Sequence, residues 1–252
     1  MFIDLAREGF YRFLAAGLRD PRDRGAELVR DPENQRLAAL AAELLRADGA
    51  ERSGRLGFGE LPIDLLTLGP ATEALKEPFE NLCLDFDRVF GMITIRECPP
   101  YETEYHASSE PFFRSQQMAD IAGFYRAFGL DPSTASPERP DYLPLQLEFM
   151  AFLLLKKRLA AEAGAGDQVE ICAAAEATFF RDHLAWWAPS FTTGLRRRAG
   201  TGFYASLSEA LAAFLPTERQ RLGVERPGLP VAPKVIERPE EQPECAGCAA
   251  QG

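Results

Sequence analysis

The stretch ERPDYLPLQLEFMAFLLL, residues 138–155, decides the fold that the sequence predicts. Pro140 ends any preceding helix, and Asp141 is a residue type that often begins the next one. A second proline, Pro144, falls in the first turn of the new helix, where its missing N–H costs little. Beyond it, residues 145–155 are apolar almost all round the predicted helix. Such a helix belongs at the centre of a bundle.

Apolar residues recur at helical spacing on both sides of this stretch, which predicts helices in most of the chain. The faces consist of Phe10, Leu14 and Leu18; Leu37, Leu40 and Leu44; Phe79, Leu82, Phe86 and Val89; Ile121, Phe124 and Phe128; Phe180, Leu184 and Trp187; and Leu207, Leu211 and Phe214. Each face needs a packing partner, and the last helix is expected to end at Pro216. A strand-like stretch at residues 92–95 is too short to suggest a sheet. The sequence therefore predicts an all-α helical bundle.

Proline, serine and aspartate are dense in residues 131–140, a composition typical of a connector. We interpret this segment as a hinge between an N-terminal helical block, residues 1–130, and a C-terminal helical block, residues 141–221. Repeated prolines interrupt any periodic pattern in residues 222–252, where apolar residues are sparse. That last segment is predicted to be a disordered tail.

Acidic residues outnumber basic ones by 38 to 28, so the 252 residues carry a formal net charge of -10. Such a surface repels a phosphate backbone and attracts a cationic peptide, so nucleic acid is not an expected partner. Charged side chains interrupt residues 1–18, unlike the apolar segment of a signal peptide. The longest apolar run, residues 149–155, is far shorter than the roughly 20 residues that cross a bilayer. We expect a cytoplasmic protein without membrane insertion.

Five cysteines are scattered along the chain. Three of them lie in or beside apolar sequence and are interpreted as core residues: Cys83, Cys98 and Cys172. Cys245 and Cys248 form a C-x-x-C pair, which can bind a metal or cycle as a dithiol. A tetrahedral zinc site usually has four ligands, however, and the chain has only two histidines, His106 and His183, and no second C-x-x-C. We favour two exposed thiols and expect no metal or other cofactor; a metal-handling or redox protein is the alternative.

The sequence contains none of the motifs that mark common catalytic sites. G-x-x-x-x-G-K-[ST], H-E-x-x-H and G-x-S-x-G are all missing. The glycines of residues 54–59 are interpreted as a turn because no strand precedes them. His183 could act as a base beside an acid in a hydrolase, but a histidine at the edge of the core, bonded to a carbonyl, is the commoner case. We therefore do not expect an enzyme.

Two features point to a binding surface. Residues 98–105, CPPYETEY, place Tyr101, Glu102 and Tyr105 in a short turn. Aromatic rings beside carboxylates can hold a guanidinium group by stacking and by a bidentate ion pair. The second feature is Glu148, an acid within the apolar run and roughly on the same helix face as Asp141. Burying it requires a partner, which is either an internal arginine (Arg126 or Arg139) or a ligand.

Three motifs together resemble a known family. They are PPYETEY at residues 99–105, MADIAGFYRAFGL at residues 118–130 and ERPDYLPLQLEFM at residues 138–150. In this order they resemble the TorD/DmsD/NarJ-type maturation chaperones of molybdenum oxidoreductases, and most of all those of the DMSO reductase type II enzymes. The resemblance runs from about Phe79 to Phe191.

This resemblance implies an all-α, TorD-like fold and a non-catalytic chaperone. Such a chaperone binds the twin-arginine signal peptide and the apo form of a molybdopterin oxidoreductase subunit, and assists cofactor insertion before export. Asp141 and Tyr142 match an Asp-His pair near the hinge that is associated with peptide binding; tyrosine here replaces the histidine. Some members are associated with GTP, for which this sequence shows no site. The expected form is a monomer or a domain-swapped dimer. The expected peptide-binding residues are Tyr101, Glu102, Tyr105, Pro140, Asp141, Tyr142 and Glu148.

Overall fold

The computed structural model describes residues 2–49, 54–91, 97–106, 111–131, 137–226 and 228–233. Its α-helices are α1 (Phe2–Gly17), α2 (Glu27–Arg30), α3 (Pro32–Gly49), α4 (Gly69–Ala74), α5 (Phe79–Phe90), α6 (Pro111–Ala127), α7 (Leu143–Glu162), α8 (Gly166–His183), α9 (Ala188–Ala199) and α10 (Phe203–Arg221). Single turns of 3-10 helix are η1 (Arg24–Ala26), η2 (Ile63–Leu65) and η3 (Glu102–Glu104). No strand occurs in these ranges, so the all-α prediction is confirmed. The strand-like stretch at 92–95 lies outside the described residues.

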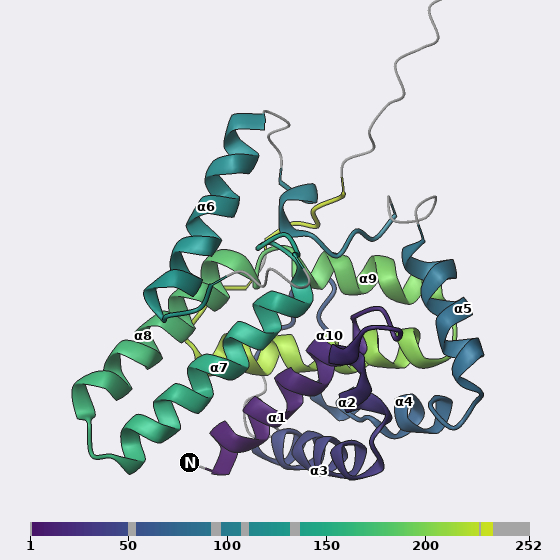
Figure 1. Cartoon of the computed structure of the whole chain (residues 1–252), viewed down its shortest axis with the longest axis horizontal. Coiled ribbons are helices and arrows are strands. Elements are labelled where there is room, and N and C mark those ends of the chain that lie inside the picture. The colour runs from purple at the N-terminus through teal and green to yellow at the C-terminus, as the bar shows by residue number, and fades with distance from the viewer. Residues whose placement is uncertain are drawn as a thin grey trace, which may run out of the picture.

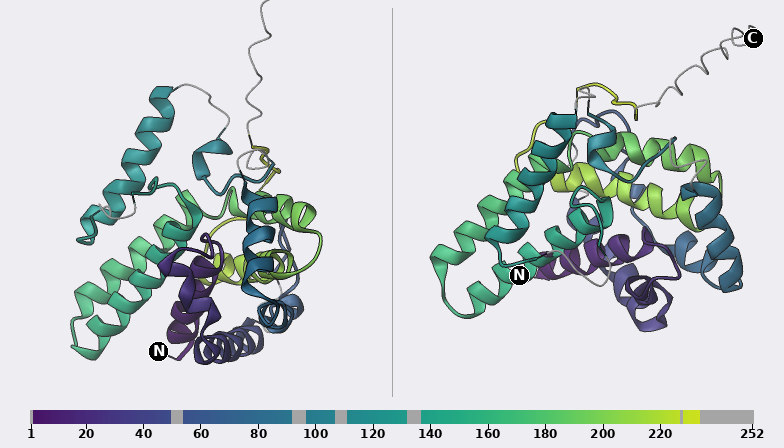
Figure 2. Two further views of the ribbon diagram at one scale, coloured as in Figure 1. Left: turned by 45° about the vertical axis from the view of Figure 1, so that its right-hand side comes forward. Right: turned by 45° about the horizontal axis from the view of Figure 1, so that its top comes forward.

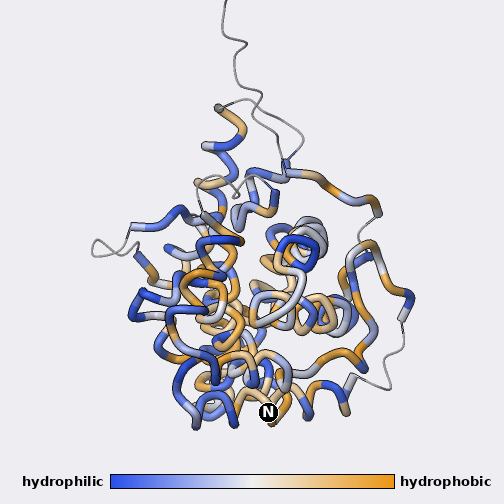
Figure 3. Tube along the Cα trace, turned by 90° about the vertical axis from the view of Figure 1, so that its right-hand side faces the viewer, coloured by the Kyte–Doolittle hydropathy of each residue, from blue (hydrophilic) through white to orange (hydrophobic). Residues whose placement is uncertain are grey.

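Helices α1, α7 and α10 form the centre of the molecule. Helix α1 packs against α3 and α7, α7 packs against α8, and α10 lies along α9 (Figure 1). The two further views in Figure 2 show the same arrangement, with α6 leaning outward from the body. Hydrophobic and hydrophilic residues alternate along most of these helices (Figure 3). Amphipathic helices of this kind bury one stripe against their neighbours.

The expected end of the last helix at Pro216 is wrong, because α10 continues through this proline to Arg221. A proline inside a helix leaves the carbonyl four residues earlier without its N–H donor. That carbonyl belongs to Ala212, and it accepts a hydrogen bond from the backbone N–H of Leu61 at 3.0 Å. A loop from another part of the chain thus satisfies the group that the proline frees.

The prediction of which face of α3 is buried is also wrong. The leucines are 44 to 48% exposed: Leu37, Leu40 and Leu44. The side of α3 that enters the core consists of Ala38, Ala41, Ala42 and Leu45. Small side chains let two helices approach closely, so the alanine stripe packs against α1 and the larger leucines lie outside the contact. Residue size decided which of two neighbouring stripes was buried.

One hydrophobic cluster contains residues from both predicted blocks. Phe10 and Tyr11 of α1, for example, each contact the ring of Phe214 in α10 edge-on, with ring centroids 4.9 Å apart. The division of the chain at residues 131–140 stays a prediction. Three buried, free cysteines confirm the core assignment of Cys83, Cys98 and Cys172. Cys245 and Cys248 lie outside the described residues.

A buried cluster of charges, which the sequence did not reveal, joins α1 to α8 and α10. The Arg7 guanidinium is 1% exposed and donates from Nε to Glu218 at 2.7 Å, while its Nη2 pairs with Glu176. Tyr11 donates its hydroxyl hydrogen to Glu218 at 2.9 Å, and Lys157 of α7 bonds Glu176 at 2.8 Å. Burial alone would lower the pKa of Arg7, but Glu218 and Glu176 raise it well above its ordinary value. Arg7 is therefore a buried, permanently charged link between helices.

After α10 the chain turns back toward α9. Val231 donates its backbone N–H to the Ser190 hydroxyl at 3.0 Å, and its half-buried side chain packs against the core. Leu229 in the same segment is 80% exposed. Part of the segment beyond residue 222 thus contacts the body.

Candidate functional site

The loop that contains η3 is joined to the start of α7 by a short antiparallel bridge between Tyr101 and Tyr142. The Glu102 N–H donates to the Asp141 carbonyl at 3.0 Å, and the Leu143 N–H donates to the Pro100 carbonyl at 2.8 Å. The rings of the two bridge tyrosines lie 5.3 Å apart. The bridge brings together six of the residues named from the sequence: Tyr101, Glu102, Tyr105, Pro140, Asp141 and Tyr142.

The Asp141 side chain does not cap α7, contrary to the sequence-based expectation. Tyr142 is the N-cap residue and makes no side-chain cap bond. Instead Asp141, which is 0% exposed, reaches back to the η3 loop. Its Oδ2 accepts hydrogen bonds from the backbone N–H of Thr103 at 3.1 Å and from the Thr103 hydroxyl at 2.7 Å. Asp141 therefore fixes the conformation of this loop.

Arg139 completes the arrangement around Asp141. Its Nε and Nη2 donate to the two oxygens of that carboxylate at 2.9 and 2.7 Å. The guanidinium also lies over the Tyr101 ring, 4.3 Å from its centroid, and its Nη1 bonds Glu104 at 3.2 Å. Burial alone would lower the pKa of Arg139, but Asp141 and Glu104 raise it. A guanidinium does stack on Tyr101, but it is that of Arg139 in the same chain, and its bidentate partner is Asp141 instead of an acid within residues 98–105.

Glu102 lies on the inner side of the loop and is 1% exposed. Its Oε1 lies 3.2 Å from His183 Nδ1, and its Oε2 accepts a hydrogen bond from Gln146. Burial raises the pKa of Glu102, against the opposing effect of His183 and Gln146. The ring partner of His183 is thus a carboxylate, not the carbonyl expected from the sequence. The ring of His183 also packs against Phe179, with centroids 4.9 Å apart, in the aromatic core.

Pro140, Tyr142 and Glu148 contact other elements. The Pro140 carbonyl accepts a bond from the Tyr125 hydroxyl at 2.9 Å, and the Tyr142 hydroxyl donates to the Leu18 carbonyl at 3.4 Å. The partner of Glu148 is Arg19, at 2.8 Å, and neither of the two arginines that the sequence suggested. The Glu148 side chain is 44% exposed. Glu148 therefore binds a different arginine from Asp141, the buried acid of the motif at residues 138–150, which is called the hinge motif below.

A groove of about 710 Å³ lies beside the outer end of the η3 loop. Its lining residues come from the loop, from α6, from the end of α8 and from the C-terminal segment: Tyr105, His106, Gln117, Asp182, Trp186, Val231 and Ala232. The Tyr105 ring stacks on Trp187 at 5.2 Å, and the His106 ring meets Trp186 edge-on at 5.9 Å. The buried bonds of the hinge motif thus hold one wall of an open, aromatic groove.

Two polar atoms of groove residues lack a hydrogen-bond partner in the part of the chain that the structure describes. They are the hydroxyl of Tyr105 and the amide oxygen of Gln117. Asp182, by contrast, is paired with its neighbour Arg181 at 2.7 Å, and its side chain is 43% exposed. A surface pair of this kind contributes little and exchanges readily. Both of these atoms are themselves buried, so what the groove presents to a ligand is the half-buried ring of Trp186 and the accessible carboxylate of Asp182.

Of two adjacent tryptophans, Trp187 lies on an apolar face predicted from the sequence and is 0% exposed, whereas Trp186 is only half-buried and lines the groove. Helical spacing distinguishes Trp187 from its neighbour, because Trp187 continues the face of Phe180 and Leu184.

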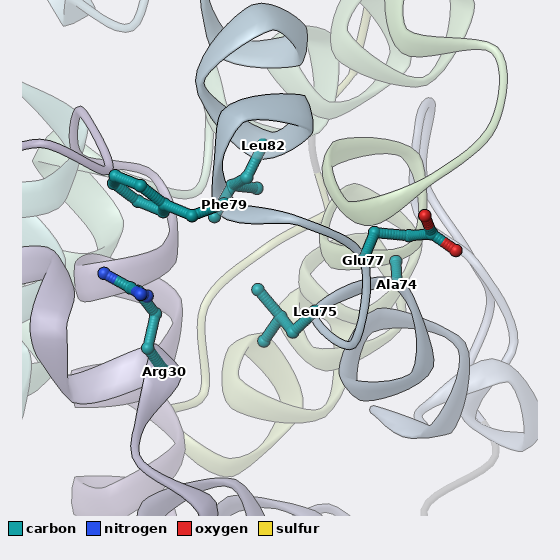
Figure 4. Close-up of a pocket in the computed structure, with 6 residues that line it drawn as sticks. All are labelled: Arg30, Ala74, Leu75, Glu77, Phe79 and Leu82. Carbon is teal, nitrogen blue, oxygen red and sulfur yellow. The ribbon is translucent and has the colours of Figure 1, made fainter.

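A second, much smaller cleft lies between α2 and the start of α5 (Figure 4). Arg30 stacks on the Phe79 ring at 4.0 Å, beside Leu75 and Leu82. The volume of this cleft, about 60 Å³, is too small for a peptide. Among the described residues no group of three or more His, Cys, Asp or Glu side chains is placed to hold a metal ion. No helix in the described ranges is long and apolar enough to span a membrane.

The family model of the nitrate reductase delta subunit matches residues 63–193, just over half of the 252 residues. The chain belongs to this family, that of the NarJ/TorD chaperones. The matched region includes the η3 loop, the hinge motif and the end of α8. The segment at 229–233 lies outside it.

Several curated relatives carry chaperone names. The selenate reductase assembly chaperone protein of Thauera selenatis is 33% identical over 112 residues, 44% of this chain and 56% of the relative. The chlorate reductase assembly chaperone protein of Ideonella dechloratans is 32% identical over 106 residues, 42% of this chain and 53% of the relative. Chaperone protein TorD of Aeromonas salmonicida is 27% identical over 146 residues, 58% and 63% of the two chains. The chain thus spans less than two thirds of the length of these relatives.

These names confirm the resemblance found in the sequence. The family is one of chaperones and not of enzymes, and its fold is all-α. The selenate and chlorate reductase relatives agree with the resemblance to chaperones of the DMSO reductase type II enzymes.

Proposed function

We propose that this chain is a cytoplasmic assembly chaperone that binds the twin-arginine signal peptide of a molybdenum-containing oxidoreductase subunit. It holds the apo subunit while the cofactor is inserted, before export. The observation that carries the proposal is the groove of about 710 Å³ beside the hinge motif. Family membership supports the client class, because the relatives are named for the assembly of such reductases.

The groove has the chemistry that a cationic and apolar peptide requires. Its volume falls within the roughly 300 to 1,000 Å³ of known ligand sites. Trp186 and His106 supply ring surface for an apolar side chain or for a guanidinium. Asp182 supplies a carboxylate, and the net charge of -10 attracts a cationic peptide from a distance.

The residues named from the sequence then have different roles. Asp141 and Glu102 hold the η3 loop in place and do not themselves receive the peptide, because their carboxylates are used internally. The ring of Tyr101 is covered by Arg139. Tyr105 contributes directly to the wall of the groove. Glu148 is a second, outer acid that can exchange Arg19 for an arginine of the client.

Isothermal titration calorimetry with a synthetic peptide tests this proposal. The peptide has two consecutive arginines followed by an apolar segment of about ten residues, and the control peptide has glutamines in place of both arginines. We expect binding that weakens with salt, and a weaker interaction with the control peptide. No binding of the arginine peptide at any salt concentration would contradict the proposal.

A matched pair of variants assigns the site. Asp182→Asn removes one charge-assisted hydrogen bond, worth about 1.5 to 3 kcal/mol, so affinity should fall about tenfold or more. Glu73→Gln changes the same charge on another exposed helix, α4, where Glu73 pairs with Lys76. Its affinity should match that of the unmodified chain. Equal effects of both variants would mean that the loss reflects net charge and not a contact in the groove.

A further inference from the structure

We propose that Val231 and Ala232, in the segment of residues 229–233, form one wall of the peptide site, so that a segment beyond the family-matched region takes part in binding. This inference rests on the proposed function of the groove. It concerns a part of the chain that the sequence had assigned to a disordered tail.

The segment is attached to the body at a defined place. The Val231 N–H donates to Ser190 Oγ at 3.0 Å, and Ser190 lies in the first turn of α9 with 9% of its surface exposed. The Val231 side chain packs on the core, and both Val231 and Ala232 line the groove. One backbone bond and one half-buried side chain thus place this segment beside Trp186, in the turn between α8 and α9.

The segment is a wall of the groove and not an occupant of it. With the segment in place, the groove still has about 710 Å³, enough for several peptide side chains. A peptide that enters this space must contact Val231 as well as Tyr105 and Trp186.

The position of Val231 and Ala232 should raise the affinity of the groove for a peptide. The segment is held weakly by its own contacts, and a peptide in the groove adds contacts to it. Part of the apolar surface that the peptide buries therefore belongs to Val231 and Ala232. Removing that surface should weaken binding while leaving the fold unchanged, because the helices form without it.

The experiment measures the dissociation constant of the two-arginine peptide for full-length variants by calorimetry. Val231→Asn should weaken binding about fivefold or more, since it removes an apolar contact of a half-buried side chain. Ser190→Ala removes the hydrogen bond that anchors the segment, and should weaken binding to a smaller extent. Leu229→Asn is the matched control: the same kind of change in the same segment, at a side chain that is 80% exposed and does not line the groove.

Trp186→Ala is measured in parallel to report on the groove itself. If Trp186→Ala weakens binding while Val231→Asn binds like the unmodified chain, the proposed role of Val231 in the wall is overturned and the proposed function stands. Tighter binding by Val231→Asn also overturns it, because the segment would then compete with the peptide. If the unmodified chain does not bind the peptide, the proposed function fails and this inference fails with it. The melting temperature, followed by circular dichroism, should be the same for Val231→Asn, Ser190→Ala and Leu229→Asn as for the unmodified chain.

Discussion

Thr103 and Asp141 lie 38 residues apart in the chain, and both the backbone N–H and the hydroxyl of Thr103 donate to one carboxylate oxygen of Asp141. Because Asp141 is fully buried, this pair cannot contact a peptide directly. It fixes the η3 loop, whose outer end carries Tyr105 and His106 into the groove. We infer that the aspartate of the hinge motif acts on peptide binding by positioning this loop.

Asp141→Asn should destabilise the protein. The change weakens four hydrogen bonds and leaves the Arg139 guanidinium without its carboxylate, so the free energy of unfolding should fall by about 2 to 4 kcal/mol. Urea unfolding followed by circular dichroism measures it. Glu148→Gln is the control, because Glu148 forms a half-exposed ion pair whose loss should cost under about 1 kcal/mol. Similar losses for both variants would contradict the structural role of Asp141.

Arg7→Met should be more destabilising than any surface charge removal. It leaves Glu218 and Glu176 buried with one positive partner fewer, which should cost about 3 to 5 kcal/mol. Arg36→Met is the control, since Arg36 pairs with Glu33 on the exposed side of α3 and its loss should leave the unfolding free energy nearly unchanged. Chemical denaturation of both variants gives the comparison. A loss below about 1 kcal/mol for Arg7→Met would show that the buried cluster contributes little.

Glu102 should give the stability a measurable pH dependence. Burial raises its pKa in the folded protein above the ordinary value of 4.5, so the folded state holds this proton more tightly than the unfolded chain does. The resulting stabilisation is fully present below pH 4.5 and is lost as the pH rises through the folded pKa. Glu102→Gln lacks this contribution.

The test compares urea unfolding of the unmodified chain and Glu102→Gln at a series of pH values. The difference in unfolding free energy, unmodified minus variant, should decrease as the pH rises from 4.5 and then become constant. A difference that increases with pH would mean that the pKa of Glu102 is lowered in the folded protein.

Helical periodicity was enough to predict the fold class and most of the helices. It failed where two stripes on one helix were both apolar: in α3 the alanines were buried and Leu40 remained exposed. It also failed at Pro216, because the donor for the carbonyl that this proline frees, that of Ala212, is the backbone N–H of Leu61, 151 residues before Ala212. No local pattern predicts such a contact.

The candidate site was predicted in position but not in role. The sequence suggested a guanidinium-binding surface at Tyr101, Glu102 and Tyr105; a guanidinium does lie on Tyr101 of this loop, but Glu102 and Tyr105 are buried. What the sequence could not show is that Arg139 turns back onto it, since that depends on a bridge between segments about 40 residues apart. The groove was missed because its walls come from four separate parts of the chain.

Gly59 should be intolerant of any side chain. Its φ is +76°, and a Cβ would lie 2.2 Å from the Pro189 carbonyl oxygen at the start of α9. Gly59→Ala should therefore lower the unfolding free energy by more than the about 1 kcal/mol expected from the backbone conformation alone. Gly129→Ala supplies that baseline, because Gly129 has a φ of +79° and open space around it. Equal melting temperatures for the two variants would mean that the loop does not pack on α9 as described.

Hydrogen–deuterium exchange with and without the two-arginine peptide tests the central claim most directly. If the peptide binds in the groove, exchange should slow in residues 101–106, at the end of α8 and in residues 229–233, while α3 and α4 should be unaffected. Residues 229–233 report separately on the proposed wall. Slower exchange confined to elements away from the groove, or no change anywhere when the peptide is bound, would contradict the account.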